Sequence, residues 1–140
     1  MKSGAETRKR IETLKRISRL QAHLKDLKHA RVVAIEHEQA RLSDEMTAVF
    51  EALANGALAY GAQARFGVRH ALKLEQRIEA LSAEGRETQG KARQFGLRAK
   101  LAEQAAGRAL VRYRDQTERR ALVDLIDRAL ARRDASSTQE

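Results

Sequence analysis

The chain has 140 residues, of which 34% are charged, 42% hydrophobic and 4% aromatic, with no Pro, Cys or Trp and a formal net charge of +9. These values leave room for one domain, exclude disulfides and thiolate zinc sites, and are typical of long helices. No apolar run approaches the roughly 18 residues that a membrane-spanning helix needs, and no signal peptide is visible. We therefore expect a soluble cytoplasmic protein, one that can also lie at the inner face of the membrane.

The positive charge is concentrated near the start of the chain. Residues 1–35 hold ten Lys/Arg against three Asp/Glu, residues 36–55 hold one against five, and residues 111–140 hold seven against six. A charge of this size favours an acidic partner, but it does not choose among protein, nucleic acid and lipid headgroups.

Helical periodicity predicts a first helix over about residues 7–55, ending at the helix-stop signal Asn55-Gly56. Its first apolar residues follow the three-four spacing of a coiled coil, and two steps of four around Arg31 indicate a stutter. We expect its seam to contain Ile17, Leu20, Leu24, Leu27, Ile35, Leu42, Met46, Val49 and Leu53.

A glycine-rich segment, residues 55–67, is predicted to form a bend, and a second helix is predicted over about residues 68–133. Its seam follows two heptad series with mostly small side chains, which permit close helix pairing. These positions are Ala71, Leu74, Ile78, Leu81, Gly85, Thr88, Ala92, Phe95, Ala99, Ala102, Ala106, Ala109 and Tyr113. We thus expect an all-α fold, a single antiparallel two-helix coiled-coil hairpin over residues 1–134 with unequal arms and a disordered tail at residues 135–140.

The sequence singles out no catalytic, cofactor-binding or metal site. Its four histidines are six, eight and thirty-three residues apart, whereas a helical metal pair needs a spacing of three or four. Glycines occur at no phosphate-loop spacing, and a two-helix hairpin does not provide the concave pocket of an enzyme. We expect a non-enzymatic protein that needs no cofactor.

The second helix is predicted to outlast the first by roughly 18 residues, leaving an apolar stripe with a basic rim near residues 115–133. Such an unpaired stripe is a candidate protein-binding surface. Its candidate residues are Arg119, Arg120, Leu122, Leu125, Ile126, Arg128, Arg132 and Arg133. The alternative is that a different overlap of the arms, or a homodimer, covers the stripe.

The segment Gln116–Arg133, QTERRALVDLIDRALARR, resembles the C-terminal arm of the FliJ/YscO family of export-apparatus stalk proteins. The stretch RISRLQAHLKDLKHAR in the first arm is similar in style to that family. This resemblance implies an export stalk or escort of a flagellar or type III secretion system. It also implies three protein partners, namely a hexameric export ATPase, the membrane export gate and escort chaperones.

Two alternatives remain open, a generic basic coiled-coil adaptor and a non-specific nucleic-acid-associated protein. The Arg clusters suit phosphate contacts, but no aromatic residues interleave with them, so base stacking is unsupported. Protein partners are therefore favoured over nucleic acid.

Overall fold

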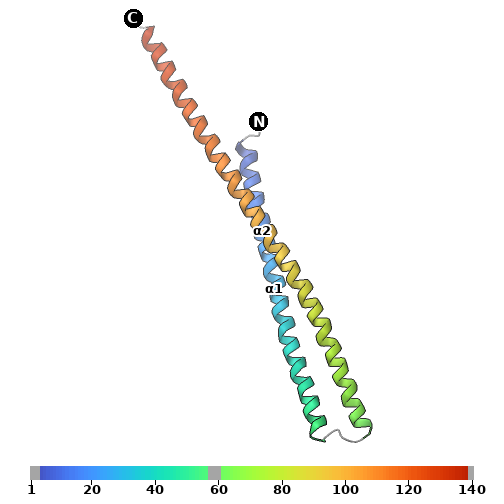
Figure 1. Cartoon of the computed structure of the whole chain (residues 1–140). Coiled ribbons are helices and arrows are strands. Elements are labelled where there is room, and N and C mark those ends of the chain that lie inside the picture. The colour runs from blue at the N-terminus through green and yellow to red at the C-terminus, as the bar shows by residue number, and fades with distance from the viewer. Residues whose placement is uncertain (1–3, 57–60, 139–140) are drawn as a thin grey trace. The chain divides into compact units, whose positions relative to one another are not determined.

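The computed structural model describes residues 4–56 and 61–138, which form two long helices (Figure 1). α1 spans Gly4–Ala54 with 51 residues, and α2 spans Ala62–Ser137 with 76 residues. The helices pack against each other, and the described ranges contain no strand. The predicted all-α helical hairpin is therefore confirmed. Since the chain has no Pro, no residue removes a backbone donor from either helix.

α1 ends close to the predicted stop signal. The Asn55 amide donates to the Glu51 carbonyl over 2.9 Å, and the Gly56 amide donates to the Leu53 carbonyl over 3.3 Å. Gly56 has a φ of 76°, a left-handed conformation that glycine adopts without steric cost.

α2 begins earlier than predicted, at Ala62 instead of near residue 68. The Gly61 carbonyl accepts a hydrogen bond from the Arg65 amide over 3.3 Å, which starts the helix. Gly67, the predicted end of the bend, instead lies buried inside α2. A glycine in a helix costs only about 1 kcal/mol relative to Ala, so one glycine does not stop a helix that packs well. Residues 57–60 of the predicted bend lie outside the described residues.

The chain divides into two compact units where the sequence predicts a single domain. Unit 1 combines Met1–Leu20 with Arg98–Glu140, and unit 2 comprises Gln21–Leu97. Each unit contains a segment of α1 and a segment of α2. Packing between the two helices therefore stabilises each unit internally.

Unit 2 contains the end of α1, the start of α2 and the larger apolar core. Ile35, Leu42, Leu74 and Leu81 are buried there, with Met46, Val49 and Ile78 packed around them. Leu81 is 0% exposed and Ile35 is 1% exposed, the two largest side chains that are fully enclosed.

Cross-helix pairs flank this core at intervals of one heptad. The three pairs, with the distance between their nitrogen and oxygen atoms, are Arg31 with Glu84 at 2.7 Å, Glu38 with Arg77 at 3.5 Å, and Glu45 with His70 at 3.1 Å. Residues seven apart occupy the same heptad position, so each pair lies along the same edge of the two-helix seam. The opposite charges of the Arg31–Glu84 and Arg77–Glu38 pairs favour this register over a shifted one.

Unit 1 is held by smaller contacts. Ile11 is its buried residue from α1, and it is joined by small buried residues of α2, Ala99, Ala102 and Ala106. The Ser18 hydroxyl donates to the Ala99 carbonyl over 3.0 Å, which needs a close approach of the two helices. Small seam residues permit that approach, as predicted.

The thirteen predicted seam positions of α2 are confirmed, since all of them are buried or half-buried. The buried ones are Ala71, Leu74, Leu81, Thr88, Ala92, Ala99, Ala102 and Ala106, and the half-buried ones are Ile78, Gly85, Phe95, Ala109 and Tyr113.

The predicted first half of the α1 seam is wrong. Ile17, Leu20 and Leu27 are 41%, 56% and 53% exposed, and Arg31 is exposed as well. Their predicted neighbours Leu24, Met46, Val49 and Leu53 are half-buried, and Ile35 and Leu42 are buried.

The less exposed positions of α1 instead follow an unbroken alternation of three and four residues. They are Gly4, Thr7, Ile11, Leu14, Ser18, Gln21, Lys25, Lys28, Val32 and Ile35, with Ala22 and Leu24 half-buried beside them. Because the seam of α2 is also unbroken, α1 needs no stutter to stay in contact with it. Polar side chains fit against the small residues of α2, as the Lys25 stem does beside Gly96, 3.3 Å from where a Cβ would lie.

α2 also continues further than predicted. Residues 135–137, predicted to be disordered, are helical, and residues 139–140 lie outside the described residues. The Ser137 and Thr138 hydroxyls donate to the Asp134 carbonyl over 3.0 and 3.1 Å. The Thr138 amide donates to the same carbonyl over 3.2 Å, so these hydroxyls add to the backbone hydrogen bond at the helix end.

Candidate protein-binding surface

The last part of α2 has no partner helix within the described chain. Tyr113 is half-buried, and every described residue from Arg114 to Thr138 is exposed. The predicted overhang is therefore present in unit 1, and we call residues 114–138 the unpaired segment.

Large apolar side chains gather in the unpaired segment. They are Leu122, Val123, Leu125, Ile126 and Leu130, with exposures from 50% to 61%. At roughly 100° per residue, Leu122, Leu125, Ile126 and Ala129 fall on one face of the helix, with Val123 and Leu130 at its edge. We call this face the apolar face.

The charged residues divide between the apolar face and the opposite face. The same helical angle puts Arg119 and Arg133 on the apolar face and Arg132 near its margin. The opposite face carries two arginines, Arg120 and Arg128, and two acids, Asp124 and Asp127. Arginines therefore predominate on the apolar face over residues 119–133, which Glu118 joins one turn before Leu122, whereas positive and negative charges balance on the other face.

Arg120 differs from the other predicted site residues because it lies against α1. Its Nη1 is 4.0 Å from where a Cβ on Gly4 would lie, and the Tyr113 ring lies 3.6 Å from the same point. All eight predicted residues thus lie on the exposed segment, but Arg120 and Arg128 lie opposite the apolar face, and Arg120 also lies beside Gly4 of α1.

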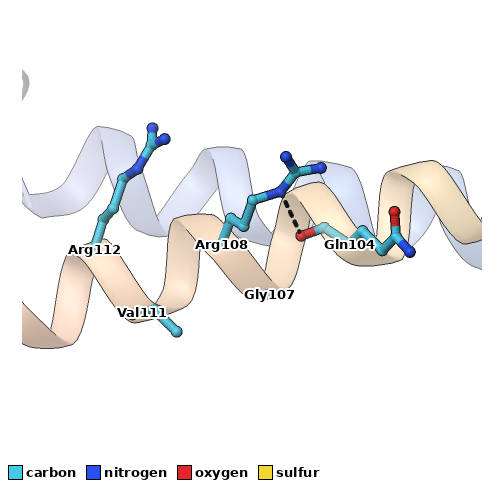
Figure 2. Close-up of a pocket in the computed structure, with 5 residues that line it drawn as sticks. All are labelled: Gln104, Gly107, Arg108, Val111 and Arg112. Carbon is cyan, nitrogen blue, oxygen red and sulfur yellow. Dashed lines mark hydrogen bonds between the residues drawn. The ribbon is translucent and has the colours of Figure 1, made fainter.

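A groove on the outer surface of α2 was not predicted. Gln104, Gly107, Arg108, Val111 and Arg112 line an open concavity of about 540 Å³ (Figure 2). The Arg108 Nε donates to the Gln104 carbonyl over 3.4 Å, the dashed line in the figure.

The spacing of the groove residues explains its shape. Gln104, Gly107, Arg108 and Val111 stand at i, i+3, i+4 and i+7, the four corners of the hole that accepts a side chain in knobs-into-holes packing. Nothing lies within 4 Å of where a Cβ on Gly107 would be, so the missing side chain deepens the hole. In the sequence, Gly107 is the residue that indicates this hole. Its spacing from Val111 becomes informative only once the structure shows that this face is exposed.

Titratable residues of the described chain do not gather into a chemical centre. No three His, Cys, Asp or Glu side chains among residues 4–56 and 61–138 are placed to hold a metal ion. His70 contacts Glu45 over 3.1 Å and stacks on Phe66 with ring centroids 6.3 Å apart. His23, His29 and His37 are exposed.

The two units differ strongly in charge. Unit 1 holds seventeen Lys/Arg against nine Asp/Glu, and unit 2 holds eleven against ten. The excess of +8 in unit 1 against +1 in unit 2 assigns most of the protein's positive charge to the unit that carries the unpaired segment.

Neither helix, over the residues described, contains a segment long and apolar enough to cross a membrane. No family model, curated protein or solved structure matches this chain.

Proposed function

We propose that this chain is a non-enzymatic stalk or escort protein that binds a protein partner through the unpaired segment of α2. One observation carries the proposal: residues 114–137 are helical and exposed along their whole length, yet keep five large apolar side chains. Burying a side chain of this kind contributes about 1.5–3 kcal/mol, so a partner that covers the apolar face gains substantial binding energy.

The arginine border favours an acidic partner. Since Arg119, Arg132 and Arg133 form no ion pair within the described residues, their charges are available to carboxylates around a partner's groove. An amphipathic helix that docks into a groove is a common mode of protein recognition. The hole at Gly107 supports the same mode of recognition in the part of α2 that precedes the unpaired segment.

The partners we propose are the hexameric ATPase and the export gate of a flagellar or type III secretion system, with escort chaperones as further partners. The resemblance of Gln116–Arg133 to the FliJ/YscO family supports this assignment, because that segment coincides with the unpaired segment. This function would put the protein in the cytoplasm, at the inner face of the membrane.

A second candidate function rests on the +8 charge of unit 1. A basic helical surface binds nucleic acid through phosphate contacts, without sequence preference. In that case the affinity for duplex DNA would fall steeply with salt, and the apolar face would contribute little.

Two charge-matched variants test the proposal. Leu125→Glu with Ile126→Glu adds two negative charges on the apolar face, and Thr117→Glu with Ala131→Glu adds two on the opposite face. We expect the first variant to lose capture by the purified export ATPase ring and export gate, and the second to retain it. Helicity and melting temperature should stay close to the parent values in both.

Several outcomes would contradict parts of the proposal. Much earlier melting of Leu125→Glu with Ile126→Glu would show that the stripe is structural core. Equal loss of capture in both variants would indicate generic electrostatics. No capture of ATPase or gate by the parent chain would remove the export assignment, and DNA binding with a steep salt dependence would then favour the second candidate.

A further inference from the structure

The outer surface at the start of α2 combines cations with exposed apolar side chains. Arg65, Arg69 and Lys73 follow one another at intervals of four residues, so they lie in a row on one face of the helix. Phe66, Val68 and Leu72 lie beside this row and are 71%, 50% and 52% exposed. We call these six residues the basic bend face, and they all belong to unit 2.

The basic bend face points away from the core of unit 2. Gly67, Ala71 and Leu74 alternate with its residues along α2 and are buried. At roughly 100° per residue, the centre of the cation row lies about half a turn from these buried positions. No side chain of α1 therefore needs to cover it.

The cation row has no acidic partner among the described residues. Elsewhere in unit 2 the basic side chains of Arg31, Arg41, Arg77 and Lys91 contact carboxylates. Arg65, Arg69 and Lys73 make no such contact within residues 4–56 and 61–138, although unit 2 as a whole is almost neutral. Like charges four residues apart destabilise a helix, so folding alone does not explain the row.

Folding does not explain the exposure of the apolar residues of this face either. Phe66 is the most exposed of the large hydrophobic residues in the described chain, and its ring contacts only the imidazole of His70 among aromatic groups. A shallow concavity lies beside it, lined by Gly61, Ala62, Arg65, Phe66 and Arg69. A surface with cations around Phe and Leu has the composition of helices that lie in the headgroup region of a membrane.

We propose that the basic bend face binds the surface of an anionic phospholipid membrane, with the cations on phosphate and carboxylate headgroups and Phe66 in the interfacial region. The face lies on the outer side of one helix, and its concavity beside Phe66 is shallow. The fluid surface of a bilayer adapts to such a face, whereas a protein partner would need a matching surface. This contact does not depend on the unpaired segment of unit 1, and it is separate from the proposed export function.

Vesicle binding by the full chain tests the charge requirement. Phosphatidylcholine vesicles, with and without phosphatidylserine, are titrated with the parent chain and two variants. Arg65→Gln, Arg69→Gln and Lys73→Gln remove the row, and Arg10→Gln, Lys15→Gln and Arg16→Gln remove three exposed cations of unit 1. Juxtamembrane cations each contribute about fivefold, so removing the row should weaken binding to anionic vesicles on the order of 100-fold.

The unit 1 variant should lose no more than a few-fold, because its cations have no exposed Phe beside them. Equal losses in the two variants would overturn the proposal in favour of generic attraction by net charge. Unchanged binding after removal of the row, or equal binding of the parent chain to neutral vesicles, would overturn it as well. Circular dichroism confirms that each variant remains helical.

A fluorescence reporter tests the location of the contact. The chain contains no Trp, so Phe66→Trp gives a single emission signal from the basic bend face. We expect its emission to shift to the blue with anionic vesicles and to stay unchanged with neutral ones. No shift while the protein is vesicle-bound would contradict the proposal. An equal blue shift with polyglutamate would overturn it by indicating an acidic protein partner.

Discussion

The Arg8 guanidinium donates a 2.8 Å hydrogen bond from Nη2 to the Tyr113 hydroxyl, joining residues 105 positions apart in the sequence. The guanidinium carbon also lies 5.7 Å from the centroid of the same ring. Tyr113 is the last half-buried residue of α2, since the described residues after it are exposed. This contact therefore lies at the end of the half-buried part of α2, and Arg120 of the unpaired segment reaches back beside it toward Gly4.

The first prediction concerns the ionisation of Tyr113. The hydrogen bond and then the charge of Arg8 lower the pKa of Tyr113 from its usual value near 10, and the same hydrogen bond raises the pKa of Arg8. The folded chain therefore releases this proton at a lower pH than the unfolded chain does. Its contribution to stability is absent at neutral pH and grows as pH rises from the lowered pKa toward 10.

Arg8→Gln should raise the pKa of Tyr113 and remove that gain in stability. The measurement is tyrosinate absorbance in a Tyr60→Phe background, where Tyr113 is the only tyrosine. Identical titration curves with and without Arg8 would show that the contact is not formed in solution.

The second prediction concerns the core of unit 2. Leu81 is fully buried, so Leu81→Ala should lower the free energy of unfolding by about 2–5 kcal/mol, through lost burial and the cavity that remains. Leu72→Ala is a matched control on the same helix, where the side chain is 52% exposed, and it should change stability by less than about 0.5 kcal/mol. Chemical denaturation measures both, and equal effects would contradict the register of unit 2.

A pair of substitutions in neighbouring residues of α1 tests the seam directly. The Gln21 Oε1 is buried without a hydrogen-bond partner among the described residues, whereas Leu20 is 56% exposed. Gln21→Leu should stabilise the fold by about 1–3 kcal/mol, because it removes an unsatisfied acceptor. Leu20→Gln should be nearly neutral. The opposite order, in which Leu20→Gln destabilises strongly, would restore the seam expected from the sequence.

Two glycines should respond in opposite directions to a methyl group. A Cβ on Gly90 meets nothing within 4 Å, so Gly90→Ala should stabilise α2 by about 0.5–1 kcal/mol through backbone entropy. Gly61 has a φ of 59°, so Gly61→Ala should destabilise by about 1–2 kcal/mol. Thermal melts compare the two, and similar effects of both changes would contradict the conformation assigned to Gly61.

The sequence by itself determined two long helices, the end of the first at Asn55-Gly56 and the seam of the second. Each of these features depends on local signals, namely the absence of Pro, a glycine that adopts positive φ, and a heptad series dense enough to leave one choice of face. The unpaired segment could also be predicted, because the unequal helix lengths follow from the same local signals.

Only the tertiary structure decided which face of the first half of α1 is buried. Ile17, Leu20 and Leu27 offer the more apolar stripe, and burial energy considered for α1 alone favours it. The unbroken small-residue seam of α2 and the charge pairs that begin at Arg31 instead hold α1 in one continuous register, which carries Ser18 and Gln21 inward. Register is a property of the two helices together, so the periodicity of one helix could not determine it. For the same reason, that periodicity could not predict that Arg120 lies against Gly4.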